Sequence, residues 1–403
     1  MGTPLGSGAN SSDLQQMNRT LVLTLLRKLK TTTRAELSRM TGLKRATITN
    51  IINDFIDCKI VKELGITEGE KGRRSIQIAL DPGNRRVVAV RLARKYFTVG
   101  IFDILGNIYF KETIALDFKD GSEYAMGLIR DKIQELFRKY RHIFVIGVAL
   151  PGPYLKTENR IVQISDFPGW EDINVVEQLQ EQFGVPVYVE HDSNASALTE
   201  WWYGDSIQNL DGDTVLLNII AGQGVGASLV HNGSIYRGGH GLAGEIGHTS
   251  IAFDGPRCAC GNRGCLDLYC SSIVLIRNIE RKVSDYPQSV LYGQKITLEK
   301  IKEAVQLNDP LAVEEITDMA GYLACGIANV IKIYDPDVVV IGDELADIGG
   351  ECFLRAIMKG LEGRVLPGIL KRITFQLSQI ENPMLSGAMC VAVDNVFQNL
   401  QIL

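Results

Sequence analysis

Four of the eight cysteines fall within thirteen residues, at positions 258, 260, 265 and 270, and a histidine lies ten residues before the first of them. In a chain of 403 residues such a local cluster does not make a disulfide scaffold. The spacing His-x9-Cys-x-Cys-x4-Cys supplies one imidazole and three thiolates, the four donors of a closed structural zinc site. We therefore predict that one loop folds around Zn²⁺ held by His248, Cys258, Cys260 and Cys265. With four protein donors the ion has no position left for a reactive water, so it organises the loop and does not catalyse.

The rest of the sequence has an ordinary globular composition. Hydrophobic residues make up 45% and charged residues 22%, which suits packed cores and excludes collagen, coiled coil and wholesale disorder. At about 150 residues per domain, the chain makes two or three domains. No apolar run approaches the roughly 18 residues of a membrane span, and no basic-then-apolar leader opens the sequence. We expect a soluble, cytoplasmic protein with no membrane partner.

The formal net charge of −5 conceals an asymmetry along the chain. Residues 1–80 carry 13 Lys+Arg against 7 Asp+Glu, whereas residues 81–403 carry 29 against 40. A basic N-terminal part on an acidic remainder indicates that the first part meets a polyanion. Residues 1–12, rich in Gly and Ser, are expected to form a disordered tail.

Helical patterns occupy the basic part. Apolar residues recur at helical spacing over residues 13–30 and again over residues 44–58. Between these runs, Thr33 and Glu36 have the spacing of a capping box, whose hydroxyl and carboxylate satisfy free amides at the start of a short helix over residues 34–40. Thr41-Gly42-Leu43 then supplies a tight turn. This order predicts a helix-turn-helix.

Two strand-like runs, residues 60–64 and 75–80, follow the helices and complete a winged helix-turn-helix expected over residues 13–80. The loop between them ends in two arginines, which suits a narrow minor groove. The exposed face of the second helix suits base edges and phosphates, although a merely solvated face would have a similar composition. The residues expected to contact double-stranded DNA are Arg34, Lys44, Arg45, Thr47, Thr49, Asn50, Lys71, Gly72, Arg73 and Arg74.

Beyond residue 86 the hydrophobic period changes to two, with three consecutive strand-like runs followed by a helix. The same succession returns near residue 214, where Asn232-Gly233 forms a hairpin turn. Two such units predict two similar lobes, about residues 81–195 and 196–403, that face a ligand-binding cleft. The expected strands are residues 87–92, 98–102, 108–115, 185–189, 214–220, 226–230, 234–236 and 337–342, and the expected helices are residues 124–140, 296–330 and 350–363.

The segment Gly244-Glu245-Ile246-Gly247-His248, together with the cysteine run that ends at Asp267, resembles the signature of the ROK family (repressors, open reading frames and kinases). The N-terminal part resembles that of the family's transcription-factor branch, which includes xylose-, N-acetylglucosamine- and glucose-responsive repressors. The resemblance covers essentially the whole chain from about residue 13. It implies an actin-like (ribonuclease H-like) α/β body of two lobes with a structural zinc loop, and it leaves Cys270 outside the ligand set.

Sugar recognition needs fixed acceptors, because each buried hydroxyl is a donor that must be paired. The resemblance implies that Glu245, His248 and Asp267 contact sugar hydroxyls, with one histidine nitrogen for zinc and the other for the sugar. Asp267 departs from the glutamate usual there. Asp192 matches the general base of the family's kinases, while His191 replaces an asparagine. The loop over residues 151–170 is expected to form the remaining wall, with Trp170 either lining it or in the core. The predicted sugar-binding residues are His191, Asp192, Glu245, His248 and Asp267.

Phosphoryl transfer needs small residues in the phosphate loops and an aspartate near magnesium. In the kinase relatives that the sequence resembles, the first loop has the pattern Asp-x-Gly-Gly-Thr, and here it is Arg91-Leu92-Ala93-Arg94-Lys95. The second turn has Gln223 where threonine or serine is typical, and Asp343-Glu344 adds two negative charges near the nucleotide's place. These departures outweigh the retained Asp192, which we interpret as a vestigial base, and we expect no enzyme activity.

Together these patterns predict a sugar-responsive DNA-binding transcriptional regulator. We expect a repressor that a monosaccharide or sugar derivative releases from operator DNA by closing the cleft, and that acts as a homodimer or higher homo-oligomer on paired half-sites. Activation in place of repression stays open. Two alternatives are an ATP-dependent sugar kinase with a regulatory DNA-binding head, and a DNA-binding or scaffold protein that answers to a protein partner.

Overall fold

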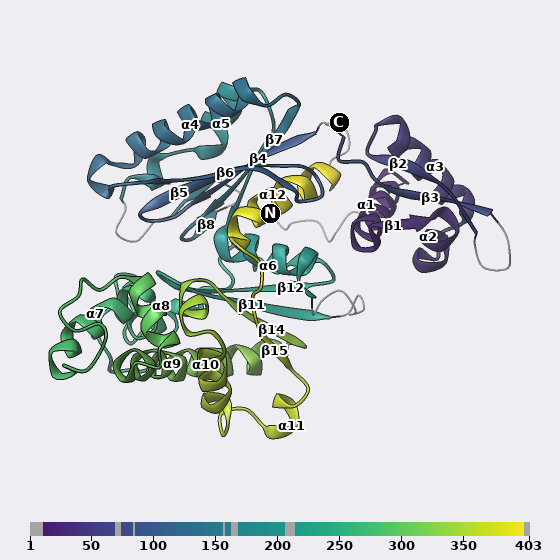
Figure 1. Cartoon of the computed structure of the whole chain (residues 1–403). Coiled ribbons are helices and arrows are strands. Elements are labelled where there is room, and N and C mark those ends of the chain that lie inside the picture. Colours follow the sequence, from purple (N-terminus) through teal and green to yellow (C-terminus); the bar gives the residue numbers. More distant parts are fainter. Residues whose placement is uncertain are drawn as a thin grey trace, which may run out of the picture.

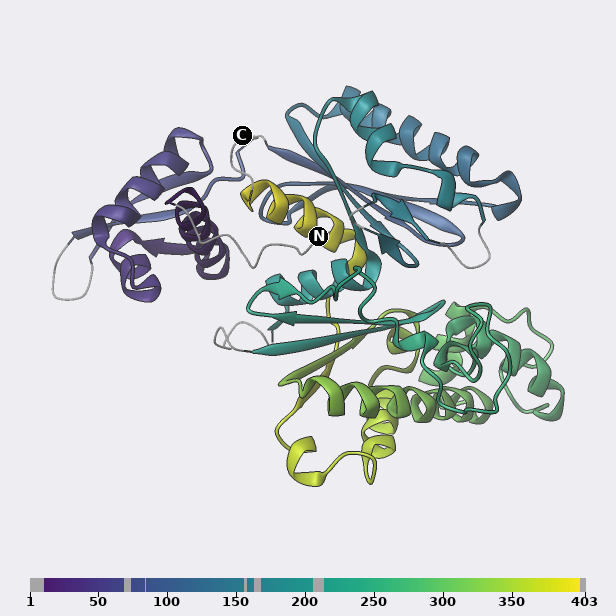
Figure 2. The same ribbon diagram turned by 180° about the vertical axis from the view of Figure 1, so that it is seen from behind.

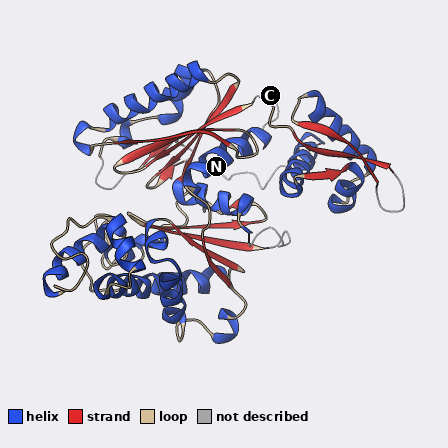
Figure 3. Cartoon of the chain, viewed as in Figure 1, coloured by secondary structure: helices blue, strands red, loops and turns tan. Residues whose placement is uncertain are grey.

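A computed structural model describes residues 11–68, 74–83, 85–155, 158–162, 168–205 and 214–398. Figure 1 shows an N-terminal unit beside the first of two α/β lobes, with the second lobe on the other side of two central helices, and Figure 2 shows the same arrangement from behind. The tail expected over residues 1–12 lies outside the described residues except for Ser11 and Ser12, which begin the first helix. Figure 3 separates the helices from the strands of each part.

The N-terminal unit packs three helices against an antiparallel sheet of order β1-β3-β2. The Thr33 hydroxyl accepts a hydrogen bond from the Glu36 amide at 3.2 Å and caps α2 as predicted, whereas the Glu36 carboxylate accepts from the Thr32 hydroxyl at 2.9 Å and not from a backbone amide. Gly42 ends α2 with a φ of 70°, a left-handed conformation that favours glycine. The first strand was not predicted, because three threonines between two helices have no alternating pattern. The elements are α1 (Ser11–Leu29), β1 (Thr31–Thr33), α2 (Arg34–Thr41), α3 (Arg45–Asp57), β2 (Val61–Glu68) and β3 (Arg74–Leu80).

The first lobe has a sheet of order β10-β7-β4-β5-β6, antiparallel from β4 to β6 and parallel from β4 to β10. Successive side chains of β4 enter different layers. Val88 and Val90 pack with α4 and α5, whereas Val87 and Ala89 pack with the C-terminal helix on the other face. The elements are β4 (Arg86–Leu92), β5 (Tyr96–Phe102), β6 (Ile108–Ala115), α4 (Ser122–Lys139), β7 (Ile143–Leu150), β8 (Tyr154–Leu155), β9 (Arg160–Ile161), α5 (Val175–Phe183) and β10 (Val187–His191), with 3-10 turns at Phe118–Asp120 and Trp170–Asp172.

The second lobe repeats this plan with a sheet of order β13-β12-β11-β14-β15. Asn232 and Gly233 have φ values of 53° and 73° and form the predicted hairpin turn. The helix expected over residues 296–330 is two helices, because the Asp309 carboxylate caps a new one by accepting from the Leu311 and Ala312 amides. The elements are β11 (Val215–Ala221), β12 (Val225–His231), β13 (Ser234–Ile235), α7 (Ser272–Lys282), α8 (Leu298–Gln306), α9 (Pro310–Tyr334), β14 (Val338–Gly342), α10 (Glu344–Leu361), α11 (Pro367–Leu370) and β15 (Thr374–Leu377), with 3-10 turns at Ile246–His248, Leu266–Leu268 and Val283–Asp285.

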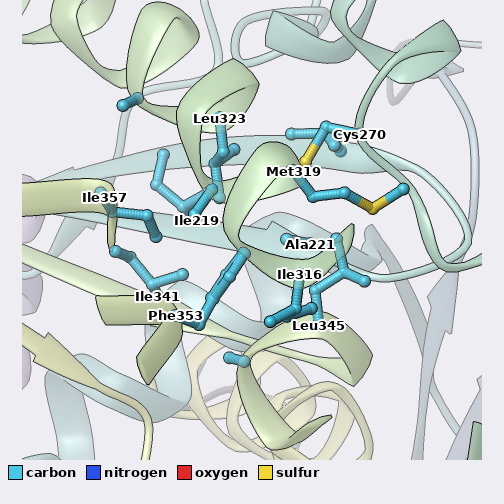
Figure 4. Close-up of a cluster of buried hydrophobic side chains, with 14 of the residues drawn as sticks. Ile219, Ala221, Cys270, Ile316, Met319, Leu323, Ile341, Leu345, Phe353 and Ile357 are labelled. Carbon is cyan, nitrogen blue, oxygen red and sulfur yellow. The ribbon is translucent and has the colours of Figure 1, made fainter. Parts of the chain in front are cut away.

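Helix α9 is the central core helix of the second lobe. By length and composition alone it is apolar enough to cross a membrane, but more than half of it is buried within the lobe. Figure 4 shows Ile316, Met319 and Leu323 of α9 beside Ile219 and Ile341 of the sheet. The apolar character of α9 is therefore that of a packed core helix.

Two helices lie between the lobes. Helix α6 (Asp192–Tyr203) follows the first lobe directly, and α12 (Pro383–Gln398) returns from the second lobe to pack on α6 and on the first sheet. The packing is close, since a Cβ at Gly387 would lie 2.0 Å from the Ala195 carbonyl oxygen. The second lobe, expected over residues 196–403, thus gives its last helix to the first lobe. The physical reason is that an apolar helix packs where a sheet face is open, wherever it stands in the sequence.

Candidate functional site: a cavity between the lobes

A cavity of about 190 Å³ lies between the two lobes, and several charged side chains contribute to its wall. It opens at the carboxyl ends of β4, β10, β11 and β14, the edge where open α/β sheets bind ligands. Pro151, Gly152, Pro153 and Val162 form part of the wall, as predicted for that loop. Trp170 is fully buried in the first-lobe core and does not line the cavity.

All five residues predicted to bind sugar line this cavity: His191, Asp192, Glu245, His248 and Asp267. His191 Nε2 lies 3.4 Å from Asp192 Oδ1 and 3.9 Å from Glu245 Oε1, and its Nδ1 is 2.6 Å from Ser193 Oγ. Residues of β10 and α6 thus meet a residue of the second lobe. The result is a group of hydrogen-bond acceptors held from both sides of the cleft.

Asp267 is fixed on the opposite wall. Its Oδ1 accepts a hydrogen bond from the Val225 amide at 2.7 Å. A Cβ at position 247 would lie 2.3 Å from the same oxygen, so the close approach requires Gly247. Burial raises the pKa of Asp267, while the Val225 amide and the nearby His248 and Arg94 lower it. The carboxylate is therefore held by the β11–β12 turn as well as by its own loop.

The four predicted metal ligands come together in the same region. Their donor atoms lie within 4.8 Å of one another, with Cys258 Sγ 3.7 Å from His248 Nδ1 and Cys260 Sγ 3.7 Å from Cys265 Sγ. Two sulfurs bonded tetrahedrally at about 2.3 Å to one ion would be about 3.8 Å apart. The cluster could therefore hold a metal ion, and His248 belongs both to it and to the cavity wall.

Cys270 is not part of this cluster. Its side chain is fully buried among the apolar residues of the second-lobe core, where Figure 4 shows it. Burial raises the pKa of the Cys270 thiol, which disfavours the thiolate that a metal requires. The position agrees with the ligand set expected from the sequence.

A buried ion pair that the sequence reasoning missed joins the lobes beside the cavity. Glu190, 4% exposed, accepts hydrogen bonds from Arg237 Nε at 2.8 Å and from Asn194 Nδ2 at 2.9 Å. Asn194 Oδ1 in turn accepts from Ser228 Oγ at 2.7 Å. The sequence does show an acidic residue, Glu190, inside an apolar strand, which indicates a buried partner. It does not show which residue that is, because Arg237 lies 47 residues further along the chain.

A second ion pair crosses the cleft between residues singled out separately in the sequence. Arg91 NH2 lies 3.7 Å from Asp343 Oδ1. Asp343 has a φ of 76°, and its carboxylate packs on Gly222, where a Cβ would lie 2.2 Å from Oδ2. Burial raises the pKa of Asp343 to about 6, and Arg91 opposes the shift. Sequence spacing could not show that these two loops meet.

The DNA-contact candidates on α3 are accessible. Lys44, Arg45 and Asn50 are exposed, and Thr47 and Thr49 are half-buried. By contrast Arg34 NH1 donates to Glu63 Oε1 at 2.9 Å and NH2 donates to Asn53 Oδ1 at 3.2 Å, so this side chain links α2 to β2 and α3. Lys71, Gly72 and Arg73 lie outside the described residues, and Arg74 is the first residue of β3.

Two lobes of the same sheet plan, closed around a cleft by central helices, define an actin-like two-lobed α/β protein. The ROK family model matches residues 87–379, and the chain belongs to the ROK family. A xylose repressor from Caldicellulosiruptor bescii is 26% identical over 381 residues, which cover 93% of this chain and 94% of the relative. The transcriptional dual regulator NagC from Escherichia coli is 28% identical over 391 residues, covering 96% and 95%.

Two solved structures share the fold. A ROK family transcriptional regulator, described as a homologue of the E. coli MLC protein, is 24% identical and has a TM-score of 0.80, covering 96% of this chain and 99% of its own. A ROK family glucokinase from Streptomyces griseus, in complex with glucose and AMPPNP, is 22% identical with a TM-score of 0.67, covering 76% and 99%. The fold is thus common to regulators and kinases, and the site must distinguish them.

Proposed function

We propose that the protein is a sugar-responsive transcriptional repressor, whose N-terminal unit binds operator DNA and whose cavity binds a monosaccharide or sugar derivative. The observation that carries the proposal is the set of acceptors His191, Asp192, Glu245 and Asp267 in one cavity, in a chain that also exposes a cationic helix face. Curated relatives named as a xylose repressor and as a DNA-binding transcriptional dual regulator support it. Repression ends because the sugar prefers a conformation that binds DNA weakly.

The DNA-binding element is a winged helix-turn-helix over residues 13–80. Helices α2 and α3 are separated by a three-residue turn, and the β2–β3 hairpin follows as the wing. In this arrangement the start of α3 enters the major groove, where Arg45 and Asn50 reach base edges or phosphates. The wing residues Lys71 to Arg74 would contact the adjacent groove.

An ATP-dependent sugar kinase is the less favoured candidate. A nucleotide's phosphates need free backbone amides and space at the glycine turn over residues 222–226. Here the Asp343 carboxylate packs on Gly222 and occupies that space. Arg91, which stands where the resembling kinases have an aspartate, is paired with Asp343. Asp192 remains in the cavity as an acceptor for a sugar hydroxyl and needs no catalytic role.

The Cys/His cluster is a structural Zn²⁺ site. Three thiolates and one imidazole at tetrahedral separations are the donor set that zinc prefers. Bound zinc would supply a fixed cross-link and no chemistry, holding the loop between Glu245 and Asp267 so that both carboxylates keep their places in the wall.

The zinc assignment is tested by Cys260→Ser, which removes one thiolate from the cluster. We expect the purified wild-type chain to hold one equivalent of zinc by atomic absorption and the variant to lose most of it, because three ligands bind far more weakly than four. The matched control is Cys58→Ser, an exposed cysteine of the N-terminal unit. A full equivalent of zinc in Cys260→Ser would reject the site.

We further propose that the protein acts in the cytoplasm. We also propose that it is a homodimer, because two N-terminal units bind paired half-sites with far higher affinity than one. Analytical ultracentrifugation of the full chain, with and without DNA, tests the oligomeric state.

The repressor function is tested by DNA release. Binding sites are first selected from a random duplex pool with the full-length protein, and fluorescence anisotropy then measures affinity with and without sugars. We expect one sugar to weaken DNA binding by roughly 5- to 150-fold, the usual range of allosteric coupling. Sugar-dependent ATP consumption that Asp192→Asn abolishes would favour the kinase. DNA binding that no sugar alters, together with capture of a protein partner, would favour the scaffold alternative.

A further inference from the structure

The charges in the cavity wall bear on which sugar derivatives the site accepts, a question that rests on the proposed function. Among the described residues, two arginines and five carboxylates line the cavity. The arginines are Arg91 and Arg94, and the carboxylates are Asp192, Glu245, Asp267, Asp343 and Glu344. Two arginines by themselves would suit an anionic ligand. The geometry points to the opposite conclusion, and we infer that the effector is an uncharged monosaccharide and not its phosphate ester.

The charge of Arg91 is already compensated within the wall. The side chain is 9% exposed, and its guanidinium lies 3.7 Å from the Asp343 carboxylate, with Asp192 and Glu344 also close enough to act on it. Asp343 is itself largely enclosed, with 14% of its side chain exposed. A phosphate brought to Arg91 would therefore meet these carboxylates as well, and like charges repel strongly where water is scarce.

Arg94 is engaged in a similar way. Its NH1 donates to the Gln223 carbonyl oxygen at 3.4 Å across the cleft, and its charge acts on Asp267. The second cation of the cavity thus lies beside a carboxylate, and it bridges the two lobes.

Two backbone amides of the glycine turn also have partners within the protein. The Gly222 amide donates to the Gly224 carbonyl at 3.0 Å, and the Val225 amide donates to Asp267 Oδ1 at 2.7 Å. The Asp343 carboxylate lies against Gly222, where an anion would otherwise approach. A turn that binds phosphate presents such amides to the ligand, whereas here they are used inside the protein.

The same wall suits an uncharged polyol. Sugar hydroxyls are donors, and the carboxylates offer several acceptor positions in fixed orientations. A phosphate ester adds two negative charges and acceptors that find few donors, so the wall acts against it while accepting the neutral sugar. The excess of carboxylates over arginines in the wall therefore selects the neutral sugar over its phosphate ester.

Isothermal titration calorimetry of the zinc-loaded full-length protein tests the inference with matched pairs: glucose and glucose 6-phosphate, xylose and xylose 5-phosphate, and N-acetylglucosamine and its 6-phosphate. We expect one neutral sugar to bind and its phosphate ester to bind at least about tenfold more weakly. A phosphate ester that binds more tightly than its parent sugar would overturn the inference and leave the proposed function standing. Absence of binding by all six would contradict both.

Asp343→Asn tests the mechanism of rejection directly. The substitution removes one carboxylate and releases Arg91, and asparagine has nearly the same size and shape as the aspartate that already adopts a φ of 76° and a ψ of −169° at this position. We expect the preference for the neutral sugar over its ester to fall by about tenfold, since one close charge interaction is lost and one cation is freed.

Glu344→Gln is the matched control, because it removes an equal charge from the wall while Arg91 stays paired with Asp343. Glu344 accepts a hydrogen bond from Ser272 Oγ, which glutamine can also accept. Its effect on the preference should be smaller than that of Asp343→Asn. An unchanged preference in Asp343→Asn would show that the Arg91–Asp343 pair does not set the selectivity.

Discussion

Glu200 is an acid buried at the junction of the two lobes. It lies in α6 with 1% of its surface exposed, and burial raises its pKa from 4.5 to about 7, although a hydrogen bond from Ser378 Oγ opposes the shift. An acid whose pKa is higher in the folded state destabilises that state as the pH rises from about 4.5 to 7, because ionisation then favours unfolding. We expect Glu200→Gln to increase the free energy of unfolding at pH 8 by about 1–3 kcal/mol. Urea unfolding at pH 5 and pH 8 measures the difference.

The control for this prediction is Glu181→Gln, which changes an exposed glutamate on α5 in the same way. It should leave the stability unchanged at both pH values. The gain in Glu200→Gln should be smaller at pH 5, where the carboxyl is mostly protonated in the folded protein. A larger gain at pH 5 than at pH 8 would contradict the raised pKa.

Among the elements, α3 has the most direct predicted role. Lys44 and Arg45 are exposed at its start, where a recognition helix meets phosphates at the edge of the major groove. The double variant Lys44→Ala/Arg45→Ala should lower DNA affinity and reduce the slope of log affinity against log salt by about two, since each lost phosphate contact removes about one released counterion. The control pair is Lys371→Ala/Arg372→Ala, two exposed cations of the second lobe. Equal effects from the two pairs would remove α3 from the interface.

The elements also show how far the sequence could predict the structure. The spacing of apolar residues, every second residue in a strand and every three to four in a helix, distinguishes the two kinds of element. The bounds of β4, β5, β6, β11 and β12 were therefore predicted to within a few residues. The same patterns carry no information about which sheet an apolar helix covers, and the place of α12 on the first lobe was therefore missed. The metal cluster was predictable because its ligands are close in sequence, whereas the Arg91–Asp343 pair spans 252 positions and depends on how the lobes meet.

At the scale of the whole molecule, α6 joins the cavity to the N-terminal unit. Its first residue, Asp192, lines the cavity, and Trp202 in its last turn lies under the guanidinium of Arg27, whose carbon is 3.2 Å from the ring centroid. Arg27 belongs to α1, so a shift of α6 on sugar binding would act directly on the N-terminal unit, the part proposed to bind DNA (Figure 1). Arg85, between the unit and the first lobe, also holds the end of α3 by donating to the Cys58 and Lys59 carbonyls.

This contact predicts a variant that separates binding from response. Arg27→Met keeps much of the side-chain volume but removes the cation stacked on Trp202, so α6 and α1 lose a specific contact. We expect DNA affinity without sugar, and sugar affinity by calorimetry, to change little, while the loss of DNA affinity caused by sugar becomes at least about fivefold smaller. Lys28→Met, the same change at the exposed neighbouring position, should respond like the wild type. Full sugar-dependent release in Arg27→Met would show that the signal reaches the DNA-binding unit by another route, through the segment that contains Arg85.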